Sequence, residues 1–254
     1  MTGQPQTAED VLSDALELFG GQNSNDADSI WYGEFELRVA PKEGRANVLL
    51  ADQLFSPGLF LAEHIELRKI VLSGLSVLEL GAGAGLPSIL ASHPTIGGAR
   101  LVVASDYPDP LILNNLQENI LRNDSTAVVE PFEWGTDPAE LLSYDPQGFD
   151  VLIMSDLLHF DASHDALLDS ATALLKRSAQ ARLYVCCGDY TKPAVCDAFI
   201  ANARERGFVI EEEPRESSWK ASRTVRGIEQ ENMDARKRQC RFWIAHWAPQ
   251  HVTL

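Results

Sequence analysis

Apolar runs alternate with helix-like segments along the chain from about residue 75 onward. Seven runs have the length and composition of buried strands, near 75–80, 100–105, 127–132, 149–155, 181–187, 207–212 and 240–247. Helical periodicity lies between them, near 86–92, 109–122, 162–177 and 193–206. Because strands that alternate with helices form a parallel sheet covered on both faces, the pattern predicts an α/β fold around a seven-stranded, mostly parallel sheet.

The residues before this core predict an extension that packs on it. Helical periodicity at 7–19 begins with a capping-box arrangement and ends at two glycines. Strand-like alternation at 29–40 predicts a hairpin, and 57–69 predicts a helix with proline in its first turn. We therefore expect one compact domain, made of an N-terminal helix and hairpin extension (1–70) and a core (71–254).

Residues 212–239 form a long polar connection between the last two predicted strands, and their pattern predicts no helix. They hold seven of the 21 basic residues of the chain. A long connection inside a compact domain is usually functional or mobile, and this one is a candidate lid over a binding pocket. We expect its basic stretch, Arg236, Lys237 and Arg238, to be a solvated surface, with docking of an acidic substrate as the alternative.

Composition excludes some classes of function. The formal net charge of −16 leaves little room for the basic patch that a nucleic acid requires. No apolar run has the length of a membrane span, and the N-terminus has neither a basic segment nor an apolar signal core, so we expect a soluble, cytoplasmic protein. The four cysteines form no C-x-x-C pair and are interpreted as reduced structural thiols, and we predict no metal site.

A glycine-rich loop follows the first core strand in the stretch VLELGAGAGLPSILAS. In an open parallel sheet, ligands bind beyond the carboxyl ends of the strands. Gly81, Gly83 and Gly85 let the backbone approach a ligand closely, and the helix that follows offers free N–H groups. The dinucleotide fingerprint G-x-G-x-x-G places a glycine where this chain has Leu86, which argues against NAD and FAD.

The second core strand ends in an acidic residue, Asp106. A carboxylate at this place can accept hydrogen bonds from both ribose hydroxyls of an adenosine cofactor. With Glu79 before the glycines, the chain has the pattern E-x-G-x-G-x-G followed by an acidic residue at the next strand end. This combination resembles the S-adenosylmethionine site of class I methyltransferases, which have a Rossmann-like fold.

The resemblance extends to one branch of that class. The runs SDYPDPLILNNLQENI, FEWGTDP and DVLIMSDLLHFDASHDALLDS are similar to the branch labelled nicotinamide N-methyltransferase-like in fungi. That branch contains the N-terminal and lysine methyltransferases of translation elongation factor 1-alpha. The similarity covers residues 75 to 210, and it implies S-adenosylmethionine as cofactor, S-adenosylhomocysteine as product and elongation factor 1-alpha as a suspected protein partner.

The resemblance also implies a role for each matching residue. Glu79 and the three glycines would line the methionine part of the cofactor, and Asp106 would hold the ribose. Tyr107 and Trp134 would flank the adenine, where an aromatic ring stacks with a gain of about 1 kcal/mol. Asp156, at the end of the fourth core strand, would bind beside the methyl group that is transferred.

Two departures from the branch concern the acceptor side. The tryptophan-rich segment expected before the core is LFSPGLFLAEHI here, which has Phe55 and no tryptophan. Many seven-strand lysine methyltransferases carry Asp-x-x-Tyr after the fourth strand, whereas this chain has Asp156-Leu-Leu-His159. These differences leave the cofactor prediction intact and the acceptor open.

Methyl transfer from a sulfonium is an in-line displacement in which the protein supplies alignment. An amine acceptor must be neutral when it attacks, so the candidate groups for orienting or deprotonating it are Asp156, His159, Asp161 and His164. Each of the last three has a structural alternative, since Asp161 and His164 are suited to cap the next helix and His159 to pack.

The sequence therefore predicts an S-adenosylmethionine-dependent N-methyltransferase that acts on a protein amine, either a lysine or an N-terminus. Two alternatives stay open. One is a small-molecule N-methyltransferase acting on a nicotinamide-like amine, and the other is a regulatory module that binds the cofactor without catalysis. Methylation of adenine in nucleic acid is disfavoured, because Asp156-Leu-Leu-His159 lacks the Asn/Asp-Pro-Pro-aromatic pattern.

Overall fold

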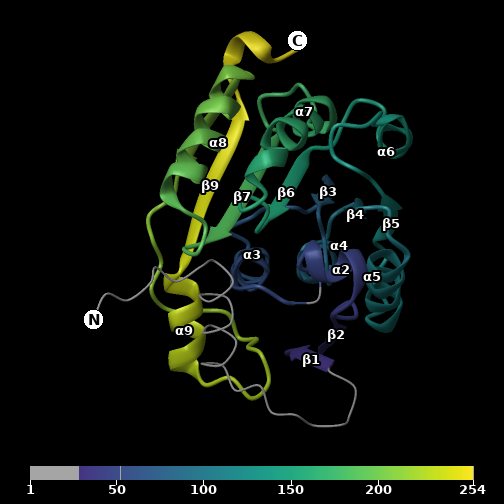
Figure 1. Ribbon diagram of the computed structural model, residues 1–254, viewed down its shortest axis with the longest axis vertical. Helices are drawn as coiled ribbons and strands as arrows, with labels where there is room; N and C mark the ends of the chain where they lie inside the picture. The colour runs from purple at the N-terminus through teal and green to yellow at the C-terminus, as the bar shows by residue number, and fades with distance from the viewer. Residues whose placement is uncertain (1–28, 52, 254) are drawn as a thin grey trace.

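The computed structural model describes residues 29–51 and 53–253, so the predicted helix at 7–19 lies outside it (Figure 1). All seven predicted core strands are present in one sheet, and the α/β prediction is confirmed. The sheet order is β5-β4-β3-β6-β7-β9-β8. β9 pairs antiparallel with both β7 and β8, and the other neighbouring pairs of these described strands are parallel. The strands are β3 (Ser76–Leu80), β4 (Leu101–Asp106), β5 (Val128–Pro131), β6 (Val151–Ser155), β7 (Arg182–Gly188), β8 (Phe208–Glu212) and β9 (Cys240–Trp247).

Helices cover both faces of the sheet (Figure 1). The central strands are apolar at nearly every position because successive side chains enter opposite cores: Leu152 and Met154 pack on one side, Val151 and Ile153 on the other. One core contains α3 (Ser56–Glu66), α4 (Leu86–Ser92) and α5 (Pro110–Arg122). The other contains α6 (Ala139–Tyr144), α7 (His164–Leu174) and α8 (Pro193–Glu205).

The predicted hairpin is also present, as β1 (Ser29–Tyr32) and β2 (Phe35–Arg38). Two amide side chains hold it in place, Asn119 of α5 and Asn123, which follows the end of that helix. Asn119 accepts from the Arg38 N–H at 2.9 Å and donates to the Arg38 carbonyl at 2.7 Å, and Asn123 bonds to both backbone groups of Glu36. Tyr32, Phe35 and Leu37 join the same apolar core as α3 and α4. The boundary between extension and core at residues 70 and 71 stays a prediction.

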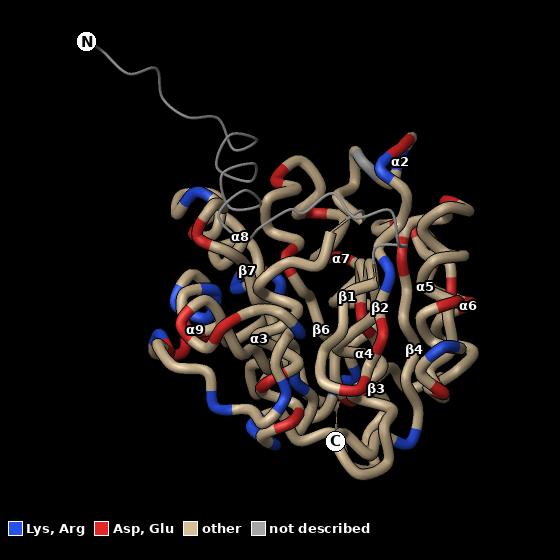
Figure 2. Tube along the Cα trace, turned by 90° about the horizontal axis from the view of Figure 1, so that it is seen from below, with Lys and Arg blue, Asp and Glu red and all other residues tan. Residues whose placement is uncertain are grey.

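The prediction for residues 212–239 is wrong in two respects. The segment contains a helix, α9 (Gln230–Arg238), which the sequence pattern did not reveal because its polar residues show no apolar stripe. Lys237 is 1% exposed rather than solvated, although Arg238 is exposed as expected. Figure 2 shows the basic and acidic positions that α9 carries along its backbone. Within the described residues, no helix is long and apolar enough to cross a bilayer.

A buried ion cluster explains the position of Lys237. Its Nζ lies 2.6 Å from Glu63 Oε2 of α3 and 2.8 Å from Glu216 Oε2, and it donates to the Ser218 carbonyl at 2.9 Å. Burial acts to raise the pKa of Glu216, but the ammonium groups of Lys237 and Lys69 outweigh it and lower this pKa to about 2. The cluster therefore attaches the 212–239 segment to α3.

Removal of the central ammonium tests this attachment. Lys237→Met keeps the volume of the side chain but leaves Glu63 and Glu216 without their buried partner, which is expected to lower the free energy of unfolding by about 3–5 kcal/mol. Urea denaturation measures the change. Arg238→Met is the matched control, because its guanidinium is exposed, and it should change stability by less than about 0.5 kcal/mol. Equal stability of the two variants would contradict the account.

Candidate active site

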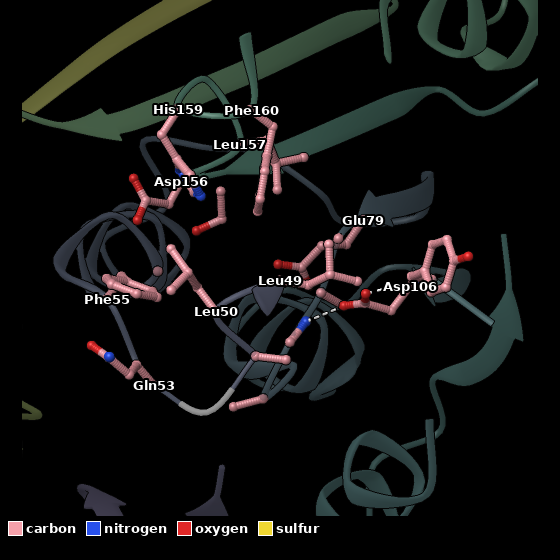
Figure 3. Close-up of a pocket in the computed structure, with 18 of the residues that line it drawn as sticks. Leu49, Leu50, Gln53, Phe55, Glu79, Asp106, Asp156, Leu157, His159 and Phe160 are labelled. Carbon is pink, nitrogen blue, oxygen red and sulfur yellow. Dashed lines mark hydrogen bonds between the residues drawn. The ribbon is translucent and has the colours of Figure 1, made fainter. Parts of the chain in front are cut away.

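A cavity opens at the carboxyl ends of β3, β4 and β6, where the fold places ligands (Figure 3). Each of these strands ends beside a buried carboxyl group. Glu79 is the next-to-last residue of β3, Asp106 ends β4 and Asp156 follows β6. Figure 3 shows Asp106 and Asp156 toward opposite ends of the cavity, with Glu79 between them.

The loop from β3 to α4 lines the floor of the cavity with backbone. Gly81, Gly83 and Gly85 all have φ between 54° and 78°, a conformation that side chains other than glycine rarely adopt. A Cβ added at Gly83 would meet no atom within 4 Å, so it would occupy open space next to the cavity. A Cβ at Gly85 would instead come within 2.5 Å of Leu116. The glycines therefore serve two purposes, open space for a ligand and close packing of the helix behind it.

Glu79 is 1% exposed, and only one of its carboxyl oxygens is bonded within the described part of the chain. Oε2 accepts from the Ser88 N–H at 3.0 Å and from the Ser88 hydroxyl, whereas Oε1 is buried beside the cavity without a hydrogen-bond partner. Burial raises the pKa of Glu79 to about 8, more than the Ser88 bonds lower it. An orphaned carboxyl oxygen in a cavity of this kind is suited to a cationic or N–H-bearing ligand group.

Asp106 is held by two backbone N–H groups. Oδ2 accepts from Gly83 and Oδ1 from Tyr107, both at 2.7 Å, so this carboxylate also fixes the glycine loop against the end of β4. Burial raises the pKa of Asp106 to about 6, and the two N–H bonds reduce that rise. Tyr107 lines the cavity beside it, and its hydroxyl accepts a hydrogen bond from Arg45 of α2 (Gly44–Val48).

Aromatic side chains cover the cavity on its other side. Trp134, from the loop after β5, makes an edge contact with Phe160, with ring centroids 5.9 Å apart. His159 packs on Phe160 with ring centroids 3.9 Å apart, and all three residues line the cavity. Burial lowers the pKa of His159 to about 4, and neither ring nitrogen has a hydrogen-bond partner among the described residues. His159 is thus a neutral imidazole at pH 7, with polar atoms available to a ligand.

Asp156 occupies a strained position at the end of β6. Its φ is 63°, in the left-handed region that few residues other than glycine adopt, and its side chain is 4% exposed. Oδ1 accepts from the Gly188 N–H at 3.3 Å, and Oδ2 accepts from the hydroxyl of Tyr190. Burial raises the pKa of Asp156 to about 6, and the hydrogen bonds from Tyr190 and Gly188 limit this rise. Asp156 is therefore ionised at pH 7.

The structure does not bring His164 or Asp161 to the cavity, which corrects their candidacy as groups that contact the acceptor. His164 is buried on the far side of its loop, with Nε2 2.8 Å from the Leu158 carbonyl and its ring 5.1 Å from Phe199. Asp161 is exposed and bonds the neighbouring Ala162 N–H. His164 begins α7 after a 3-10 turn, η1 (Asp161–Ser163), so its position follows from helix start and packing.

The cavity is bounded by a segment that the sequence pattern does not predict. Leu49, Leu50, Gln53 and Phe55 line it, between α2 and α3. None of the described residues 212–239 lines it, so the cavity lining does not support a lid role for that segment. Two adjacent leucines outside any predicted strand or core helix, followed by Phe55, were the available signal. Phe55, where this chain departs from the tryptophan-rich segment of the related branch, therefore lines the cavity.

Two solved structures that resemble this fold are methyltransferases. A methyltransferase from Pyrococcus furiosus matches 73% of this chain and 81% of its own at a TM-score of 0.51 and 15% identity. The CurJ carbon methyltransferase matches 83% of this chain and 60% of its own at a TM-score of 0.52 and 15% identity. At such identities the likeness shows the fold alone. The fold is the Rossmann-like fold of class I methyltransferases.

The family follows from sequence comparison. The model of the lysine methyltransferase family matches residues 43–203, and the chain belongs to that family. The protein N-terminal and lysine N-methyltransferase of Emericella nidulans is 32% identical over 181 residues, 65% of this chain and 69% of that protein. Its counterpart in Schizosaccharomyces pombe is 34% identical over 147 residues, 55% of this chain and 56% of that protein. The protein is thus a methyltransferase, and the match spans between about half and two thirds of these relatives.

The buried state of Glu79 leads to a prediction about stability. Its pKa is about 8 in the folded protein, against an ordinary value of 4.5 that applies once the chain unfolds. The folded state therefore holds one more proton between these pH values, and this residue lowers stability as pH rises from about 5 to 8. Glu79→Gln removes the effect and keeps an amide oxygen facing Ser88.

Urea denaturation of the natural protein and of Glu79→Gln at several pH values measures this dependence of stability on pH. The variant should gain stability relative to the natural protein by on the order of 1 kcal/mol per pH unit across that window. The difference between the two curves cancels the contributions of Asp106 and Asp156. A constant difference from pH 5 to 8 would show that Glu79 is already ionised when buried.

Proposed function

We propose that the protein transfers a methyl group from S-adenosylmethionine to an amine of a protein, either a lysine side chain or an N-terminus. The observation that carries the proposal is the set of three buried carboxyl groups along one cavity, with a neutral imidazole beside the third. S-adenosylmethionine has an ammonium group and a sulfonium, and when bound it supplies an electrophilic methyl group. A cavity with buried carboxyl groups and a glycine-lined floor matches both cations, because a cation bound beside a carboxyl group lowers its pKa and favours its ionised form.

The residues present fit this cofactor. Glu79, with its orphaned Oε1, would bind the methionine ammonium, and the open space at Gly83 would admit the chain beside it. Asp106 would accept from the ribose hydroxyls, because each of its oxygens bonds only one backbone N–H and keeps further acceptor capacity. Trp134 and Tyr107 would flank the adenine. Asp156, toward the opposite end from Asp106, would face the reactive methyl group.

An amine acceptor must lose a proton before it attacks. A lysine with an ordinary pKa of about 10.4 is neutral to about one part in 10³ at pH 7, whereas an α-amine near 8 is neutral to roughly a tenth. Asp156 is ionised at pH 7 and can hold the incoming ammonium and accept a hydrogen bond from it. His159 stays neutral, so it offers an acceptor nitrogen without adding a positive charge beside the amine.

A protein acceptor is supported by the family and by the relatives named above. Elongation factor 1-alpha is our candidate acceptor, because the resemblance of the motifs points to the branch that methylates it. We also place the activity in the cytoplasm, where a translation factor works. Phe55, which lies next to Asp156 in Figure 3, and Gln53, which lies beyond Phe55 on the same side, would contact the residues around the acceptor amine.

A methyl-transfer assay tests the proposal. The protein is incubated with tritiated S-adenosylmethionine and, separately, unmodified elongation factor 1-alpha, fungal lysate proteins and nicotinamide. We expect label in elongation factor 1-alpha, found by mass spectrometry at a lysine or the N-terminus. Asp156→Asn should lower kcat at least tenfold, because the loss of a charged hydrogen-bond partner costs about 1.5–3 kcal/mol.

Asp161→Asn is the matched control, since its carboxylate lies five residues on in the same connection but outside the cavity lining. It should retain activity within about twofold. Label confined to nicotinamide would replace the protein acceptor by a small molecule. Binding of the cofactor without label in any acceptor would favour the non-catalytic module.

A further inference from the structure

Tyr190 lies behind Asp156 and is not one of the described residues that line the cavity. It belongs to the tight loop after β7, and its hydroxyl donates to Oδ2 of Asp156. Its ring also lies 6.2 Å from the ring of Phe55, which does line the cavity. The phenol therefore connects two residues on the acceptor side without contacting the acceptor space itself.

The absence of a side chain at Gly188 allows Tyr190 to reach Asp156. A Cβ added at Gly188 would lie 2.2 Å from Tyr190 Cε1 and 2.5 Å from Cζ, so any side chain there would displace the phenol ring. The backbone of Gly188 is not in the left-handed region, so this close approach, rather than conformation, is what requires glycine. Its N–H donates to the other oxygen of Asp156 at 3.3 Å.

The 212–239 segment fixes the loop that carries Tyr190. Arg215 donates to both carboxylate oxygens of Asp189 at 2.7 and 2.9 Å, and the Asp189 N–H donates to the Gln239 carbonyl at 2.8 Å. Within the loop, the Thr191 N–H donates to the Gly188 carbonyl at 3.0 Å. The phenol is thus presented to Asp156 from a turn that is held at both ends.

We propose that Tyr190 is a positioning residue for methyl transfer: its hydroxyl fixes the Asp156 carboxylate, ionised and oriented, beside the acceptor amine. This inference rests on the proposed function and extends it to a residue outside the cavity. Asp156-Leu-Leu-His159 lacks a tyrosine three residues on, and Tyr190 supplies a phenol to the same carboxylate from another strand end.

The groups around Asp156 determine how its ionisation responds to the loss of this phenol. They are Tyr190, the thiols of Cys186 and Cys187 on β7, and His159 from its own connection. Burial raises the pKa of Cys186, and the contact with Cys196 raises that of Cys187, so both remain neutral thiols. Burial and then the Asp156 charge raise the pKa of Tyr190, which keeps it a donor.

Tyr190→Phe is the first test. Loss of the hydroxyl raises the pKa of Asp156 above its present value of about 6, because the bond that favours the ionised form is gone. The acid limb of kcat/KM against pH should move upward by about one pH unit. At pH 6, kcat/KM for the acceptor should fall about fivefold and recover toward pH 9, while affinity for S-adenosylhomocysteine stays within twofold.

Gly188→Ala is an independent second test, because it displaces the Tyr190 ring and leaves the phenol intact. It should move the pH profile in the same direction. In a Tyr190→Ala background, where the ring is absent, Gly188→Ala should change kcat/KM by less than twofold. Tyr184→Phe is the matched control: Tyr184 is a buried phenol on β7, the strand that leads into the Tyr190 loop, and it stacks on Phe242 with ring centroids 6.1 Å apart. Loss of its hydroxyl should leave the profile unchanged.

A binding measurement separates this inference from the proposed function. Sinefungin is a cofactor analogue with an amine where the methyl sulfonium stands, so it reports on Asp156 without any transfer. The natural protein should bind sinefungin more tightly than S-adenosylhomocysteine, and Tyr190→Phe should reduce that preference at least threefold at pH 6, where the shift in the pKa of Asp156 changes its ionised fraction most. An unchanged preference overturns the inference, as does an equal loss of affinity for both ligands, whether or not methyl transfer is detected.

Discussion

Three carboxyl groups buried along one edge of the sheet are the constraint on which the site depends. Glu79, Asp106 and Asp156 stand at neighbouring strand ends, and burial raises the pKa of each. Backbone or hydroxyl donors hold each of them in place, yet acceptor capacity remains on the cavity side. Desolvated carboxyl groups are costly in an empty cavity and stabilise a cationic ligand, so the arrangement favours binding over stability.

Much of this arrangement follows from local sequence. Six-residue apolar runs predict the strands, and the parallel topology then brings their carboxyl ends together without further information. The glycines at 81, 83 and 85 mark the turn because their left-handed backbone angles strongly favour glycine. Asp106 and Asp156 are predictable because each stands directly at the end of a recognisable strand.

The remainder depends on contacts that a linear pattern does not encode. Lys237 has the sequence context of a charged surface, and only its partner Glu63, on a helix far away in sequence, explains its burial. His164 has the chemistry of a catalytic group, but the course of its loop aims it at the Leu158 carbonyl. Tyr190 gives no signal in the sequence, because its meaning depends on the alignment of β6 with β7 and on the space beside Gly188.

A crystal structure of the protein with S-adenosylhomocysteine would test directly how the three carboxyl groups bind the cofactor. We expect the adenosyl group between Trp134 and Tyr107 with its ribose hydroxyls on Asp106, the amino group at Oε1 of Glu79, and the sulfur facing the Asp156 end. A reversed ligand, with its adenine near Asp156, or a ligand bound outside this cavity would contradict it.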